Sequence, residues 1–243
     1  MTSPLSAQNS KRAGYVLHVM TASGAVAGML GLEAVISGHL RAALIWLIVC
    51  QVLDGLDGPI ARKLDVTIHA GRIDGHILDL VVDYLTCVVV PVALLLSQGL
   101  LPAHYATAIA AFIFLSSALW FARTDQETVD HWFNGFPAVW NFVIPTLLII
   151  GADKDEVLVV TLALCALQLT NFKIPHLARV EKFRNLTLPL TALYLIDLTY
   201  LSWNFSDIGG EKINLVQEVF LIAFPMYIGA LSVWRTWFSK KIV

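Results

Sequence analysis

Long apolar stretches alternate with short polar or glycine-containing joints along almost the whole chain. A helix needs about 20 mostly apolar residues to cross the hydrocarbon core of a bilayer. Breaker residues such as Gly38, Gly99 and Gly151 separate the stretches. The pattern predicts eight membrane-spanning helices, at about residues 14–37, 39–62, 72–98, 101–122, 136–151, 156–176, 185–203 and 213–237.

The composition favours the same interpretation. Of the 243 residues, 57% are hydrophobic and only 14% are charged, whereas a soluble domain carries roughly 25% charged residues. The net charge of −2 gives no reason to expect a nucleic-acid partner. Cys50, Cys87 and Cys165 lie inside apolar runs and are expected to be small core residues. With neither a long linker nor a convincing repeat, residues 1–243 are predicted to form one all-α, polytopic membrane domain.

The basic residues predict the orientation of this domain. Eight spans place both termini on one side of the membrane, and Lys and Arg concentrate on the cytoplasmic side. Only Arg41, Lys154 and Lys212 fall on the opposite side, so 13 of the 16 basic residues lie with the termini. Both termini are therefore expected in the cytoplasm. The N-terminal segment is not expected to be a cleavable signal peptide. The residues on the terminal side are Lys11, Arg12, Arg62, Lys63, Arg72, Arg123, Lys173, Arg179, Lys182, Arg184, Arg235, Lys240 and Lys241.

Four aspartates lie close together at the edge of the second and third apolar stretches. Asp54 and Asp57 are three residues apart, and Asp79 and Asp83 are four apart, so each pair lies on neighbouring turns of a helix. An ionised carboxylate near the middle of a bilayer costs on the order of 3 kcal/mol. If the two helices pack side by side, the carboxylates converge, and two Mg²⁺ or Mn²⁺ ions would offset that cost. The pattern favours a two-metal site for phosphoryl transfer on the cytoplasmic side.

Small residues and one arginine accompany the aspartates. Gly58, Ala61 and Gly75 would let a backbone or a flat ring approach closely. Arg62 could form paired hydrogen bonds with a phosphate. A transporter of divalent cations would use the same carboxylates but would leave these residues unexplained. In the first stretch, His18, Thr21 and Ser23 either form a polar face towards the site or make ordinary helix–helix hydrogen bonds.

The motif resembles the signature of the CDP-alcohol phosphatidyltransferases. It reads Asp54-xx-Asp57-Gly58-xx-Ala61-Arg62, twelve residues, then Gly75-xxx-Asp79-xxx-Asp83. Most members of that family have eight residues before the second glycine. The four extra residues, and the segment from Phe133 to Asn141, resemble the bacterial phosphatidylcholine synthases, one branch of the family.

The resemblance implies a metal-dependent transfer of the phosphatidyl group from CDP-diacylglycerol to choline, with release of CMP, at the bacterial inner membrane. It also implies a possible homodimer. Asp83 would be the general base that takes the proton of the acceptor hydroxyl. The metal ligands would be Asp54, Asp57, Asp79 and Asp83, and the CDP-diacylglycerol site would be formed by Gly58, Ala61, Arg62 and Gly75.

An acceptor with a quaternary ammonium group would be held by aromatic faces. The candidates are Tyr84, Trp132, Phe136 and Trp140. An aromatic belt at the lipid interface is the alternative for each of them. Sister enzymes that use serine, inositol or glycerol phosphate also remain open. An anionic acceptor would need extra basic groups, for which Arg123 and Arg179 are candidates.

Overall fold

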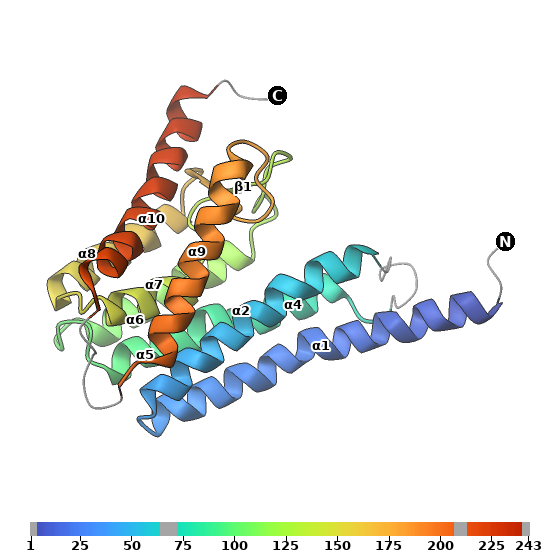
Figure 1. The fold of residues 1–243 in the computed structure, drawn as a ribbon, viewed down its shortest axis with the longest axis horizontal. Coiled ribbons are helices and arrows are strands. Elements are labelled where there is room, and N and C mark those ends of the chain that lie inside the picture. Colours follow the sequence, from blue (N-terminus) through green and yellow to red (C-terminus); the bar gives the residue numbers. More distant parts are fainter. Residues whose placement is uncertain (1–3, 64–71, 207–212, 240–243) are drawn as a thin grey trace.

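The computed structural model describes residues 4–63, 72–206 and 213–239, with side chains throughout these ranges except at 4–11, 57, 59 and 61–63. Eight continuous helical stretches follow one another in these ranges, one for each predicted stretch (Figure 1). In chain order they are α1 (Pro4–Ile36), α2 (Leu40–Lys63), α4 (Gly75–Asp83) with the π-helix η1 (Tyr84–Val89) and α5 (Val90–Ser97), α6 (Ala106–Phe121), α7 (Trp140–Ile149), α8 (Lys154–Gln168), α9 (Arg184–Trp203), and α10 (Leu215–Val233) with the π-helix η2 (Trp234–Phe238).

Three of the described helices are long and apolar enough to cross a membrane by themselves. They cover Arg12–Ile36, Gly75–Ser97 and Leu215–Phe238. Helices α6 and α7 are apolar but shorter. The ten residues of α7 extend only about 15 Å, half the thickness of a bilayer core. The polytopic membrane class is therefore supported, while eight complete crossings remain a prediction.

A small antiparallel sheet departs from the all-α expectation. Strand β1 (Trp132–Asn134) pairs with β2 (Lys173–Pro175), with Phe133 opposite Ile174. The predicted sixth stretch, which ran to residue 176, therefore ends as a helix at Gln168. The predicted fifth stretch began at residue 136, but α7 begins at Trp140, because the positive φ angles of Gly135 (82°) and Ala138 (55°) interrupt a helix there.

Helix α1 lies along α2 and the α4–η1–α5 stretch, as Figure 1 shows. Glycines on one side of α1 allow the close approach. A Cβ atom on Gly24 would lie 2.7 Å from Cγ1 of Val82, and one on Gly28 would lie 3.1 Å from the side chains of Leu85 and Thr86. Small residues at such intervals let helices pack closely in a membrane. The contact positions advance in the same direction along both segments, so α1 and the α4–η1 stretch run parallel. Equivalent levels of α1 and α4 can therefore be compared directly.

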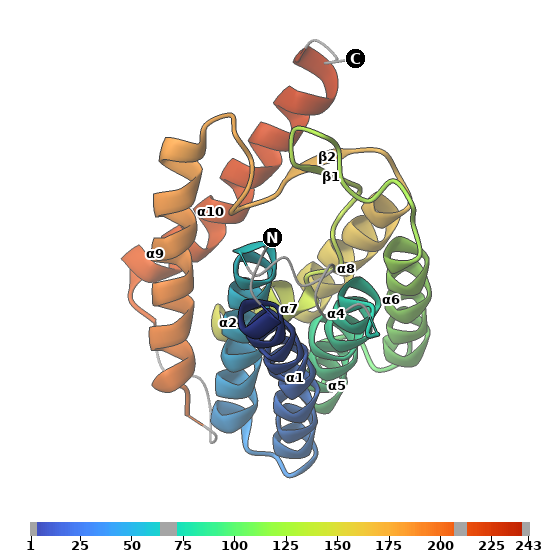
Figure 2. The same ribbon diagram turned by 90° about the vertical axis from the view of Figure 1, so that its right-hand side faces the viewer.

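We call the polar cap the two loops 122–139 and 169–183, which the β1–β2 sheet joins near the end of α10 (Figure 2). Arg123 donates to the Asp125 carboxylate at 2.8 Å and to the Thr170 carbonyl oxygen at 2.8 Å. Arg179 donates to Glu127 at 3.1 Å. Both arginines that were candidates for binding an anionic acceptor are thus engaged in contacts that hold the two loops together.

A partly buried ion pair ties η2, the continuation of α10, to the polar cap. Arg235 is 7% exposed and donates to one oxygen of Asp130 from Nε and Nη2, at 3.2 and 2.9 Å. Burial alone would raise the pKa of Asp130, but hydrogen bonds from Thr128 and Arg235 outweigh it and lower the pKa. The ion pair therefore stabilises the folded protein as long as Asp130 is ionised.

We expect Arg235→Met to lower the free energy of unfolding by about 3 kcal/mol at neutral pH, because Asp130 is left without its charged partner. Since the folded-state pKa of Asp130 is lowered, the stabilisation is present above the ordinary pKa of an aspartate and is lost as the pH falls through the folded-state value. Thermal unfolding of both proteins in detergent from pH 7 to pH 3 measures this. Arg72→Met, at an exposed position, is the control. An equal loss of stability at pH 7 and pH 3 would contradict the prediction.

Candidate active site

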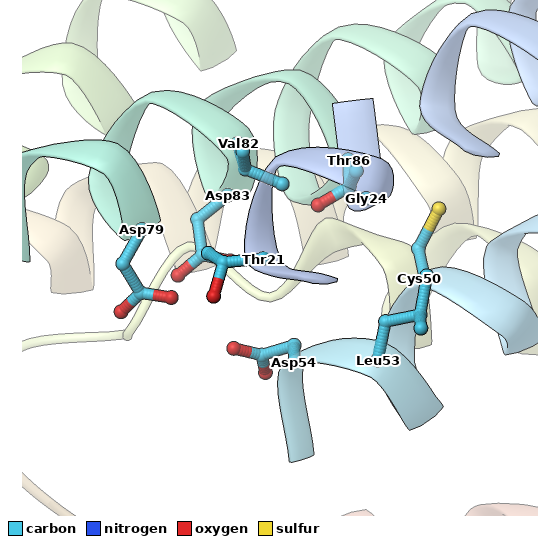
Figure 3. Close-up of a pocket in the computed structure, with 9 residues that line it drawn as sticks. All are labelled: Thr21, Gly24, Cys50, Leu53, Asp54, Asp79, Val82, Asp83 and Thr86. Carbon is cyan, nitrogen blue, oxygen red and sulfur yellow. The ribbon is translucent and has the colours of Figure 1, made fainter. Parts of the chain in front are cut away.

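Three carboxylates from two helices converge in the described part of the chain. One oxygen from each of Asp54, Asp79 and Asp83 lies within 4.8 Å of the others. Asp79 and Asp83 are four residues apart in α4 and project from one face, while Asp54 faces them from α2 (Figure 3). The sequence predicted that four carboxylates converge. The structure brings together three of them, and the side chain of the fourth, Asp57, lies outside the described residues.

The carboxylates line a pocket between three helices. Helix α1 contributes Thr21, whose hydroxyl group points into the same space as the carboxylates (Figure 3). Gly24, Cys50 and Thr86 also line the pocket, and the sequence had not placed them at the site. The complete lining consists of Thr21, Gly24, Cys50, Leu53, Asp54, Asp79, Val82, Asp83 and Thr86.

The chemistry of this cluster suits a divalent cation. Two carboxylates about 5 Å apart repel each other by about 3 kcal/mol at the effective dielectric of a protein surface, and by less where water screens them. Asp54 is exposed and Asp79 and Asp83 are half-buried, so screening is partial. Carboxylate oxygens are the preferred ligands of Mg²⁺ and Mn²⁺. Asp54, Asp79 and Asp83 could therefore bind a metal ion, which would replace the repulsion with attraction.

The other motif residues lie on the same two helices. Asp57, Ala61 and Arg62 belong to α2, and their side chains lie outside the described residues. Gly58 is half-buried in α2. Gly75 is the first residue of α4. A Cβ atom on Gly75 would lie 3.2 Å from Cε1 of His18, so this glycine makes room for an imidazole ring from α1.

Asp74 has a structural role that explains where α4 begins. Its carboxylate accepts hydrogen bonds from the backbone N–H groups of His76 and Ile77, at 3.0 and 3.2 Å. An aspartate in this position satisfies donors that have no partner within the helix. The cap fixes the start of α4, and hence the turn on which Asp79 lies.

None of the four aromatic candidates is among the described residues that line the pocket. Tyr84 donates from its hydroxyl group to the carbonyl oxygen of Phe114 at 3.0 Å. Trp132, Phe136 and Trp140 are buried at 1%, 6% and 0% exposure. These contacts explain the packing of the four side chains, and their role in binding an acceptor stays a prediction.

The structure also shows the surroundings of the polar candidates Thr21 and Ser23 in α1 and of the three cysteines. Ser23 donates to the carbonyl oxygen of Met20 at 2.6 Å, an ordinary bond within the helix. Thr21, by contrast, reaches the pocket. Cys50, Cys87 and Cys165 are free and buried, as predicted for core residues.

Comparison with known proteins agrees with this geometry. Residues 16–170 match the family described as CDP-alcohol phosphatidyltransferase, a range that includes both aspartate-bearing helices. Proteins named phosphatidylcholine synthase are similar over most of the chain. The one from Pseudomonas aeruginosa is 35% identical, over 77% of this chain and 79% of its own length. Those from Borreliella burgdorferi and Bradyrhizobium diazoefficiens are 30% and 34% identical, over 93% and 88% of this chain and 96% and 80% of their own lengths. The chain belongs to the CDP-alcohol phosphatidyltransferase family.

Proposed function

We propose that this enzyme is a phosphatidylcholine synthase, which transfers the phosphatidyl group of CDP-diacylglycerol to the hydroxyl group of choline and releases CMP. The observation that carries the proposal is the convergence of Asp54, Asp79 and Asp83 at a pocket between apolar helices. Similarity over most of the chain to proteins named phosphatidylcholine synthase supports the choice of choline. Family membership leaves no support for a divalent-cation transporter.

The proposed reaction is a single displacement at phosphorus. The choline oxygen attacks the phosphorus atom that carries diacylglycerol, and the bond from that atom to the oxygen of the CMP group breaks. A free alcohol is a weak nucleophile at neutral pH, so a carboxylate that accepts its proton accelerates the attack. Asp83 is proposed for this role. The proton moves from the choline hydroxyl to Asp83, and CMP leaves with the electron pair of the broken bond.

Two divalent cations, Mn²⁺ or Mg²⁺, would stabilise the negative charge that develops on the phosphate oxygens. The residues proposed to bind the two cations are Asp54, Asp57, Asp79 and Asp83. Gly58, Ala61, Arg62 and Gly75 are proposed to bind the CDP-diacylglycerol head group. The apolar helices around the pocket would let the diacyl tail stay in the bilayer while the head group meets the carboxylates.

The contacts of the basic residues favour a cationic acceptor over an anionic one. Arg123 and Arg179 were the arginines that an anionic acceptor would use, and both make ion pairs within the polar cap. Glycerol phosphate would therefore have to find other basic groups. The aromatic residues proposed to bind the quaternary ammonium group of choline, directly or through packing, remain Tyr84, Trp132, Phe136 and Trp140.

We also propose the orientation and the location. The distribution of basic residues supports a bacterial inner-membrane protein with both termini and the carboxylate cluster on the cytoplasmic side. A soluble acceptor from the cytoplasm would then reach the pocket without crossing the membrane. The comparisons concern single chains and give no support to the predicted homodimer.

The direct test uses purified protein, CDP-diacylglycerol, Mn²⁺ and labelled choline. Labelled phosphatidylcholine and CMP are expected in equal amounts, and neither should form when a chelator replaces Mn²⁺. Serine, inositol and glycerol phosphate are offered in parallel reactions. Product from one of these acceptors and not from choline would overturn the choline assignment but not the family. Absence of CMP release with every acceptor would overturn the proposed chemistry.

A further inference from the structure

His18 in α1 has a buried polar atom with no partner among the described residues. His18 is only 6% exposed, and its Nε2 has no hydrogen-bond partner in the part of the chain that the structure describes. On its own helix, the ring of Tyr15 contacts it edge to face, with 6.3 Å between the ring centroids. Most buried polar atoms in native proteins are hydrogen-bonded, and an unbonded one costs about 1–3 kcal/mol. Such an atom points to a ligand that the free protein lacks.

The position of His18 relates it to the carboxylate pocket. Cε1 and Nδ1 of the ring would lie 3.2 and 3.6 Å from a Cβ atom at Gly75, the first residue of α4. Thr21 lies one turn further along α1, and Asp79 lies one turn further along α4; both line the pocket. Because α1 and α4 run parallel here, His18 occupies the level immediately before the pocket, towards the N-terminal ends of both helices.

The surroundings indicate which kind of ligand would satisfy Nε2. The N-terminus of a helix attracts anions, because its first N–H groups point outwards and the peptide dipoles align. At α4 the Asp74 carboxylate already accepts from two of these groups, so the helix alone makes a poor anion site. The imidazole supplies a separate N–H donor at this level. A phosphate oxygen that extends from the carboxylate pocket towards the helix N-termini would be the matching acceptor.

We propose that His18 binds the nucleotide half of the CDP head group by donating a hydrogen bond from Nε2 to a phosphate oxygen. Gly75 is then required because a side chain at this position would displace the imidazole ring. The inference rests on the proposed function, and it adds a residue of α1 outside the aspartate motif to the binding site. His18 holds the nucleotide and takes no part in the proton transfer assigned to Asp83.

Two variants separate the hydrogen bond from the packing of the ring. His18→Phe keeps an aromatic ring against Gly75 but has no donor, whereas His18→Gln keeps an N–H donor near the position of Nε2. We expect His18→Phe to raise the KM for CDP-diacylglycerol about tenfold or more, the range for a hydrogen bond to a charged group. The KM for choline should change less than twofold. His18→Gln should restore most of the affinity.

A binding measurement provides a readout that does not depend on turnover. Calorimetric titration of the purified variants with CDP, with Mn²⁺ present, should give the same order: wild type, then His18→Gln, then His18→Phe at least tenfold weaker. Titration with Mn²⁺ alone should give equal affinities and so shows that the pocket has remained folded. His39→Phe, at an exposed histidine between α1 and α2, is the matched control and should bind CDP as the wild type does.

The outcomes distinguish this inference from the proposed function. Wild-type protein that releases CMP, together with a His18→Phe variant of unchanged CDP affinity, would overturn the role of His18 and leave the enzyme assignment intact. Equal losses of affinity in His18→Phe and His18→Gln would also overturn it, because packing rather than the donor would then matter. Wild-type protein that neither binds CDP nor releases CMP would instead overturn the proposed function.

Discussion

Asp83→Asn is expected to lower kcat by about 10²- to 10⁴-fold, the range for removal of a general base. Asparagine has nearly the same shape but cannot accept the proton of the acceptor hydroxyl. Because Asp54 and Asp79 remain in place opposite each other, binding of CDP-diacylglycerol should largely survive. The measurements are CMP release at saturating substrates and calorimetric binding of CDP in the presence of Mn²⁺.

The control for this prediction tests whether the loss belongs to proton transfer. Thr86→Val changes another polar residue of the same pocket, one turn beyond Asp83, without removing a carboxylate. It should retain far more activity than Asp83→Asn. If Asp83→Asn loses CDP affinity in proportion to kcat, Asp83 acts chiefly in binding and another group must accept the proton.

Asp54→Asn is expected to have opposite effects on stability with and without metal. In the metal-free protein it removes one of three neighbouring negative charges, so repulsion falls and the Tm should rise by a few degrees. A ligand at 100 times its Kd stabilises a folded protein by about 2.7 kcal/mol. Wild-type protein should therefore gain stability on addition of Mn²⁺, and the variant should gain much less. Turnover should fall together with the metal affinity.

Thermal unfolding with a chelator and with a series of Mn²⁺ concentrations measures both effects. Asp155→Asn, at an exposed position in the first turn of α8, is the matched control and should change neither. A variant that keeps the full stabilisation by Mn²⁺ would show that Asp54 is not a ligand. Comparison with Asp57→Ala would test the ligand whose side chain lies outside the described residues.

The sequence predicts the parts of this molecule that depend on local periodicity. Runs of apolar residues gave all eight described helices, and the four-residue spacing of Asp79 and Asp83 placed both on one face. Asp54 could be assigned to the same cluster because a group of intramembrane carboxylates requires compensation. These inferences use only neighbouring positions and the cost of burying charge.

The parts that the sequence did not predict depend on contacts between distant segments. The β1–β2 sheet pairs residues about 40 positions apart, and the run that contains β2 looks apolar enough to continue α8. Trp140 was a candidate for binding the acceptor, with an interfacial aromatic as the alternative, and its Nε1 donates to Ser117 in the core at 2.9 Å. His18 was one of several polar residues in the first stretch. Its burial, its Nε2 without a partner among the described residues and the packing of its ring against Gly75 distinguish it from Ser23.

The π-helix η1 begins directly after Asp83 and ends where α5 begins. A π-helical turn accommodates one residue more than an α-helical turn, and each residue of an α-helix advances the chain by about 100°. The extra residue therefore sets the direction in which Asp79 and Asp83 project around the helix axis, independently of which side of α5 is buried. Homologues that lack it would have to shift their hydrophobic register to preserve the same alignment. Deleting one residue from η1 would leave the buried side of α5 in its place and would rotate Asp79 and Asp83 away from Asp54.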